Sequence, residues 1–288
     1  ALMNEEKDNK ILQKDDVIIN KKSAIKALNK MLESLINDSS ITHLKKANLI
    51  SFWIKDYVKL LEFEESFDPT KNISYKRGNV MKLNFGFNVG AEYGGLHYGI
   101  VLDNNNAHNS PVVTVIPLTS IKAGKKIHTN SVDLGNELYR SLKLKYDTIS
   151  KSLNDERTQI MEMLELSNTL YNLTNDSIHN TESSAVGSDE YSKHLLDAKN
   201  YLSALNKLKD SLEDKMNHNT SQTVYLEKIG NEISQMKEGS IALVNQITTV
   251  SKMRIFDPRN LKGVLSGISL APEIMDKINC KVKELYTF

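Results

Sequence analysis

The fold of this chain is decided by the β-branched stretch Val112-Val-Thr-Val-Ile-Pro-Leu118. A short apolar run bounded by turn-forming residues predicts a buried strand. Two shorter stretches, residues 80–85 and 98–102, have the same texture and precede it, and polar or glycine-containing segments separate them. Three short strands joined by loops are typical of a small antiparallel barrel or sheet.

Helical patterns surround these strands. Residues 25–61 carry apolar side chains at spacings of three and four on both sides of a polar turn, which predicts a helical hairpin that ends before Pro69. Residues 136–238 contain no proline and follow a near-heptad register, which predicts two long helices folded into an antiparallel coiled coil with a turn at 183–188. We expect an interruption of the second long helix at Asn217–Ser221.

The β texture returns at residues 241–250, and an amphipathic helix closes the chain at 274–285. Because the long helices lie inside the sequence of the β unit, an insertion is simpler than two independent domains. We therefore expect an α+β fold with a small antiparallel β-barrel or sheet. Residues 1–70 are expected to form a tail, mobile at residues 4–16, and a helical hairpin. The barrel is expected in two pieces, 71–134 and 239–288, with the inserted long helices at 135–238 between them.

The composition is that of an ordinary soluble protein, with 40% hydrophobic and 25% charged residues among 288. No apolar run approaches the about 20 residues of a membrane-spanning helix. The first residues lack the apolar stretch of a secretory signal, so a cytoplasmic protein without membrane contact is expected. The single cysteine, Cys280, has no partner for an internal disulfide.

Charge is distributed unevenly. Residues 70–134 and 239–288 together hold 14 Lys and Arg against 7 Asp and Glu, whereas the other residues hold 23 against 29. If the basic pieces form one body, that body favours an anionic partner such as a nucleic acid. Random scatter of charges over solvated faces is the alternative.

Three segments resemble the MazF/PemK family of toxin endoribonucleases. They are Tyr75-Lys-Arg-Gly-Asn-Val80, the loop and strand from Asn88 to Leu102 with Gly90-Ala-Glu-Tyr-Gly-Gly95, and the strand that ends in Pro117-Leu-Thr-Ser120. Residues 240–250 resemble a later strand of the family. The resemblance covers roughly residues 75–134 and 239–286, and it leaves the N-terminal hairpin and the long helices outside.

The resemblance implies a homodimeric, SH3-like antiparallel β-barrel that cuts single-stranded RNA without a metal or other cofactor and is restrained by a cognate antitoxin. In such cleavage the 2′-hydroxyl attacks the adjacent phosphorus and leaves a cyclic phosphate. The reaction needs a base, an acid for the leaving oxygen and donors to the phosphoryl oxygens.

His97 stands where many family members have a catalytic arginine. A histidine titrates near neutral pH and can give or take a proton, whereas an arginine can only donate and stabilise charge. Thr119 and Ser120 match the family pair that holds phosphate oxygens. Glu92 matches the acidic residue of the loop, and it either orients His97, acts as a base, or is a solvated loop carboxylate.

Four further residues are candidates for RNA contact. Gly94 and Gly95 give backbone flexibility and close approach, and Arg77 is a candidate phosphate contact. Asn245 stands where some members have an aspartate proposed as base, and an amide cannot take up a proton at neutral pH. Either His97 and Glu92 perform the acid–base work, or the chain only binds.

Two other functions remain open. The same barrel class includes CcdB-like gyrase poisons, which act by protein contact, and a silent scaffold that works through the coiled coil is a third possibility. The added helices could mask the RNA groove or recruit a partner. The remaining histidines show no ligand spacing with carboxylates, so no metal site is expected.

Overall fold

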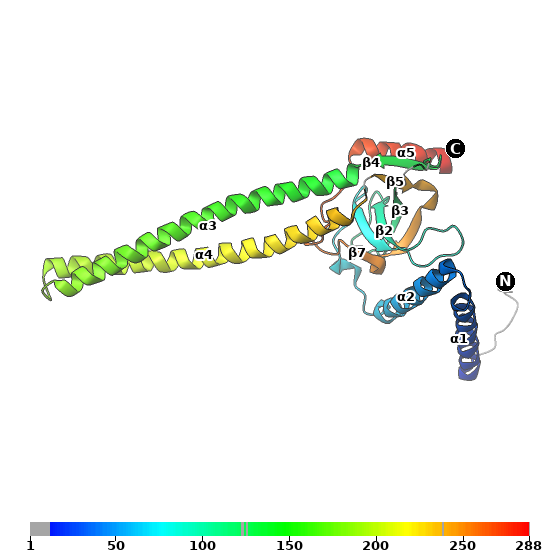
Figure 1. Cartoon of the computed structure of the whole chain (residues 1–288), viewed down its shortest axis with the longest axis horizontal. Coiled ribbons are helices and arrows are strands. Elements are labelled where there is room, and N and C mark those ends of the chain that lie inside the picture. The colour runs from blue at the N-terminus through cyan, green and yellow to red at the C-terminus, as the bar shows by residue number, and fades with distance from the viewer. Residues whose placement is uncertain (1–11, 122–123, 125, 238, 288) are drawn as a thin grey trace. The chain divides into compact units, whose positions relative to one another are not determined.

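The computed structural model describes residues 12–121, 124, 126–237 and 239–287 (Figure 1). These form two compact units: the residues up to Phe67 with the loop Phe85–Gly95, and Asp68–Asn84 with Leu96–Phe288. Most of the expected mobile tail, residues 4–11, lies outside the described residues. Its last part was wrongly predicted, because the first helix already begins at Lys14.

The first unit contains the predicted helical hairpin, formed by α1 (Lys14–Ile36) and α2 (Ile41–Glu64). The turn between them is held by Asp38, whose carboxylate accepts the backbone N–H of Ser40 at 2.7 Å and contacts the His43 ring at 2.8 Å. The bond from Ser40, then that from His43, lowers the pKa of Asp38. Ser40 is the N-cap residue of α2, so these bonds hold the chain at the entry to that helix.

The second unit contains an antiparallel sheet with strand order β4-β5-β3-β2-β1-β7, to which β6 adds by pairing with β3. The strands are β1 (Val80–Asn84), β2 (Leu96–Val101), β3 (Val112–Ser120), β4 (Ser131–Gly135), β5 (Ser240–Leu243), β6 (Thr248–Ser251) and β7 (Ile255–Asp257). Among the described residues, no strand pairing joins the ends of this path. The α+β class is confirmed, but the sheet is open and the expected closed SH3-like barrel is not shown.

The strands before residue 120 lie where the apolar stretches predicted them. The prediction of one strand over residues 241–250 was wrong, because the short 3₁₀ helix η2 (Val244–Gln246) separates β5 from β6. The strands β4 and β7 were not predicted. They have five and three residues, too few for a period-two pattern to stand out.

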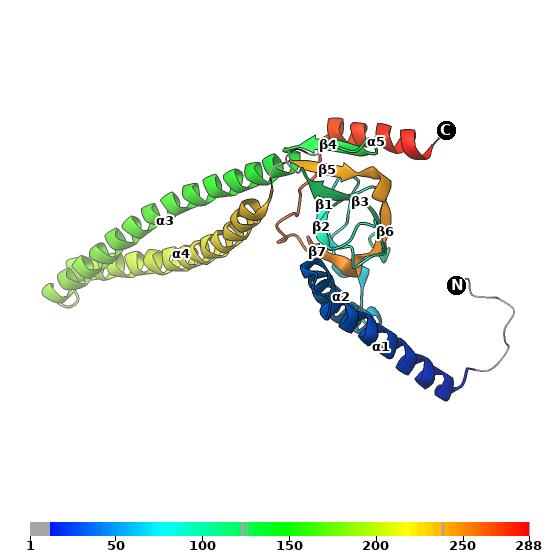
Figure 2. The ribbon, with the colours of Figure 1, turned by 45° about the vertical axis from the view of Figure 1, so that its right-hand side comes forward.

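Both faces of the central strands are buried. One face carries Ile100, Ile116 and Leu118 in a core cluster that also includes residues of α3, α4 and the predicted closing helix α5 (Pro272–Tyr286). α5 lies beside β4 (Figure 2). The other face carries Leu83 and Val115, which are fully buried. Strands buried on both sides explain why the segments read as nearly continuous apolar runs.

The long helices α3 (Glu137–Ser183) and α4 (Asp189–Gln235) run side by side as the predicted antiparallel pair (Figure 1). Ser188 caps α4 by accepting the backbone N–H of Tyr191 at 3.1 Å. The interruption expected at Asn217–Ser221 is absent, because α4 is continuous there. Asn219 points into the seam instead, where its amide donates to the backbone oxygen of Leu153 at 3.3 Å.

The base of this coiled coil belongs to the core of the sheet unit. Leu142 of α3 and Ile229 of α4 are fully buried in the same cluster as the central strands. Nearby, the Lys145 ammonium donates to the backbone oxygens of Val264 and Ser266 at 2.8 and 2.7 Å, and burial lowers its pKa. The helices are therefore built into the sheet unit at their base.

A buried lysine anchors the loop between β2 and β3. Lys252 is 1% exposed, and its Nζ donates to the backbone oxygens of Ala107 and His108 at 3.1 and 3.4 Å. It also lies 5.6 Å from the centre of the Tyr75 ring. Burial lowers the pKa of Lys252, partly opposed by the charge of Asp103.

We predict that Lys252→Met removes a pH-dependent part of stability. Between the lowered pKa of Lys252 and the ordinary value of 10.5, the unfolded chain holds a proton that the folded chain releases, so wild-type stability rises with pH across that interval. The difference in unfolding free energy, wild type minus variant, should therefore grow between pH 8 and pH 10 in urea titrations. The exposed Lys262→Met is the matched control, and equal behaviour of the two variants would contradict the prediction.

Candidate functional site

His97 lies near the start of β2, on the strand face that turns toward the apolar interior. The register sets His97 opposite Leu83 of β1, and Leu83 is fully buried. His97 itself is partly buried. Burial lowers the pKa of His97 from its ordinary value of 6.5, because removal from water disfavours the charged imidazolium. The imidazole is thus neutral at pH 7 and able to accept a proton.

Thr119 and Ser120 lie at the end of β3, where both are partly buried. The pairs of β2 with β3 run from Val101 opposite Val115 to Gly99 opposite Pro117. The paired positions end there. Because side chains alternate between the faces of a strand, His97 lies on the face of Gly99 and Thr119 on the face of Pro117, which is the same face of the sheet.

Ser120 is separated from this pair by the pleat. Successive side chains of a strand point to opposite faces, so Ser120 lies on the face opposite to Thr119. It stands opposite Ser240 of β5. The structure therefore brings His97 and Thr119 to one face, whereas Ser120 can reach the same region only through its backbone.

The loop of Glu92, Gly94 and Gly95 belongs to the first unit and is closed by its own contacts. The Glu92 carboxylate accepts the backbone N–H of Val89 at 3.3 Å, and Glu92 is exposed. A Cβ atom at Gly94 would lie 2.6 Å from the Gly86 oxygen. Gly95 has a φ of 92° and donates to Gly86 at 2.7 Å. Closure of the loop alone therefore requires glycine at both positions.

The two remaining candidates lie in different surroundings. The Arg77 guanidinium donates to the backbone oxygen of Leu102 and to the side chain of Asn279, so it joins the end of β2 to α5. Asn245 is exposed on η2. An RNA contact remains a prediction for both, and Arg77 has a structural role besides.

A polar cluster at the base of the coiled coil was missed. The Glu232 carboxylate of α4 accepts from Lys82 Nζ at 2.7 Å and from the Tyr98 hydroxyl. Lys82 and Tyr98 face each other across β1 and β2, on the side opposite to His97. Burial, and then the bond to Glu232, raises the pKa of Tyr98. The sequence held one sign of this cluster: Lys82 is charged, although it lies on the same strand face as the buried Val80.

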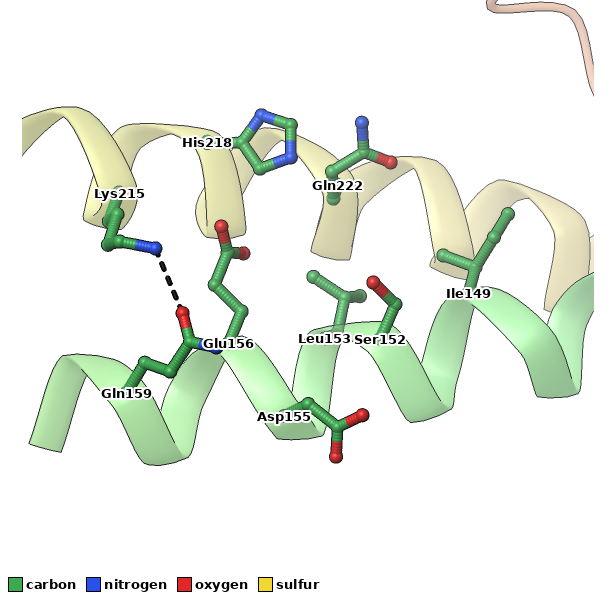
Figure 3. A pocket seen from close by; sticks show the side chains of 9 residues that line it. All are labelled: Ile149, Ser152, Leu153, Asp155, Glu156, Gln159, Lys215, His218 and Gln222. Atoms are coloured by element: carbon green, nitrogen blue, oxygen red, sulfur yellow. Dashed lines mark hydrogen bonds between the residues drawn. The ribbon is translucent and has the colours of Figure 1, made fainter.

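A cavity of about 450 Å³ lies between α3 and α4. Lys215 Nζ donates to Gln159 Oε1 at 3.0 Å at its rim, and Glu156 lies at its centre (Figure 3). None of the predicted site residues lines it. Its lining residues are Ile149, Ser152, Leu153, Asp155, Glu156, Gln159, Lys215, His218 and Gln222.

The part of the chain that the structure describes contains no cluster of three or more His, Cys, Asp or Glu side chains that could hold a metal ion. No helix in these residues combines the length and the apolar character needed to cross a membrane.

Residues 76–167 match the family model described as "PemK-like, MazF-like toxin of type II toxin-antitoxin system". The matched range contains β1 to β4, His97, Thr119 and the first part of α3. It confirms the resemblance read from the sequence, extends it into α3, and does not include residues 239–286. No curated protein matches the chain.

Proposed function

We propose that this chain cleaves single-stranded RNA as the toxin of a type II toxin-antitoxin system, because its residues 76–167 match the PemK-like, MazF-like toxins of such systems. Toxins of this family are generally endoribonucleases. The proposed setting is the cytoplasm, with a cognate antitoxin as partner and a homodimer as the active form.

One observation carries the proposal. A partly buried imidazole and a hydroxyl stand on the same face of neighbouring strands, His97 on β2 and Thr119 on β3, inside the matched range. The lowered pKa of His97 keeps the imidazole neutral at pH 7, which is the state that a general base requires.

In the proposed reaction, His97 takes the proton of the 2′-hydroxyl as its oxygen attacks phosphorus. The bond between phosphorus and the 5′-oxygen breaks, and that oxygen receives the proton from the imidazolium. Thr119 donates a hydrogen bond to a phosphoryl oxygen, whose charge grows in the transition state. The products are a 2′,3′-cyclic phosphate and a free 5′-hydroxyl, with no metal required.

The other candidate residues bind the RNA strand in this proposal. The Ser120 backbone and the exposed amide of Asn245 supply contacts to phosphates and bases. RNA contact by Gly94 and Gly95, which belong to the first unit, stays a prediction from the sequence. Without the 2′-hydroxyl, DNA of the same sequence has no nucleophile and should remain intact.

The test is to incubate the purified chain with a mixed RNA pool in chelator and to map the new ends. We predict cuts with cyclic phosphate ends, and a loss of about 10²- to 10³-fold in Thr119→Val, which keeps the shape of the side chain but removes the donor. The matched control is Thr114→Val, on the same strand. Absence of cleavage by the wild type would favour a binding function of the CcdB type.

A further inference from the structure

The outer half of the coiled coil exposes large apolar side chains along one side. Leu164, Tyr171 and Ile178 of α3 follow one another at intervals of seven residues, as do Leu195 and Leu202 of α4. These five residues, called the side strip below, are between 37% and 57% exposed. A spacing of seven keeps the side chains of each helix on one line along its axis.

A hydrogen bond nearer the base shows that both lines lie on the same side of the helix pair. Arg157 of α3 donates to the Thr223 hydroxyl of α4 at 3.2 Å. Leu164 follows Arg157 by seven residues, and Leu202 precedes Thr223 by twenty-one. Because the heptad register is kept, the side of the helix pair that carries this bond also carries the side strip.

The buried residues of the seam between the two helices change along its length. Near the base the seam is apolar, with Leu153 and Ile160 buried. Farther out the buried seam residues of α3 are Thr174 and Ser177, and α4 contributes Ala198. Large apolar side chains of this half also lie beside the seam, in the side strip, where they are exposed. This is the pattern of helices that pack in a bundle of more than two.

We propose that the side strip is an interface with a second copy of this chain, and that two coiled-coil hairpins form a four-helix bundle. The outer half of a 47-residue helix is about 35 Å long, and two helices are about 20 Å wide, a footprint of about 700 Å². Stable interfaces bury about 800 Å² per partner, so this footprint supplies nearly all of the buried area that a stable interface needs.

Charge selects the second copy and its orientation. Residues 164–182 of α3 hold three acidic residues and no Lys or Arg, whereas residues 195–209 of α4 hold three lysines and one aspartate. A two-fold axis along the hairpin lays α3 of one copy over α4 of the other. Acidic and basic segments then face each other at the same depth, and all neighbouring helices are antiparallel.

Sedimentation of the full-length chain tests this interface. The double variant Tyr171→Glu, Leu202→Glu is expected to sediment at half the mass of the wild type, with a dissociation constant raised at least about 100-fold. Leu144→Glu, Leu196→Glu is the matched control, because these leucines are more exposed and lie off the strip. A wild type that is monomeric, or a strip variant of unchanged mass, would overturn the proposal.

Cross-linking gives a second measurement that does not depend on how the glutamate variant folds. In a Cys280→Ser background, chains carrying Tyr171→Cys are mixed with chains carrying Leu202→Cys and oxidised. The expected product is a disulfide-linked pair of the two different chains. Only monomers after oxidation would overturn the interface. Neither readout involves RNA, so the result is independent of the proposed nuclease activity.

Discussion

Replacing His97 by alanine is expected to lower RNA cleavage by about 10²- to 10⁴-fold, the usual contribution of a positioned acid–base group. The reason is the loss of the group that takes the 2′-hydroxyl proton. Wild-type cleavage should also fall as the pH drops through the pKa of His97, which burial places below 6.5, because the imidazolium cannot accept a proton. Initial rates on a single-stranded oligonucleotide between pH 5 and pH 8 measure both effects.

The control for His97 must separate chemistry from folding. His218→Ala removes an exposed histidine of α4 that lies outside the proposed site, and it should leave the rate unchanged. His97→Arg restores the residue type that is common at this position in the family. It should keep RNA binding but shift or abolish the acid limb of the pH profile. An alanine variant with the full wild-type rate would remove His97 from the mechanism.

The second large effect concerns stability. Ile229→Ala is expected to lower the free energy of unfolding by about 2–5 kcal/mol, because it leaves a cavity in the core shared by the sheet and the base of the coiled coil. Urea titration followed by circular dichroism measures it. The exposed Leu144→Ala, in the same part of the coiled coil, should change the unfolding free energy by no more than about 0.5 kcal/mol.

This expectation decides how the helices can be shortened. Removing residues 140–235 would take Leu142 and Ile229 out of the core, so lost activity would report misfolding. Replacing residues 160–214 by a short Gly/Ser turn keeps both, because Gln159 and Lys215 already face each other across the hairpin. In that shortened chain, Ile229→Ala should lower the free energy of unfolding by as much as it does in the full-length chain. A stable, active chain without residues 140–235 would contradict the shared core.

Local periodicity was read correctly where the segments are long. The heptad pattern predicted α3 and α4, and the only error there was at Asn219. Its amide is a poor core residue by composition, yet it is buried because the Leu153 oxygen and the Glu156 carboxylate receive its two N–H groups. A polar residue that breaks a pattern in one helix can be satisfied by the other, and one helix alone does not reveal this.

The residues of the candidate site remain a prediction, and the structure adds their surroundings. His97 and Thr119 were selected by motif order, and their shared strand face follows from the register of β2 against β3. Arg77 was expected on the surface, but its guanidinium joins β2 to α5. Glu232 was not selected at all, since 150 residues separate it from Lys82 in the chain.

The sequence by itself determined the long helices, the central strands, their order and the residues that resemble the toxin family, because side-chain periodicity and motif spacing are properties of neighbouring residues. Only the tertiary structure decided that the sheet is open, that Lys252 is buried against backbone oxygens, and that the coiled coil shares its base with the sheet core. Each of these depends on which distant segments meet. Burial and strand pairing contribute free energy only after these distant segments have met.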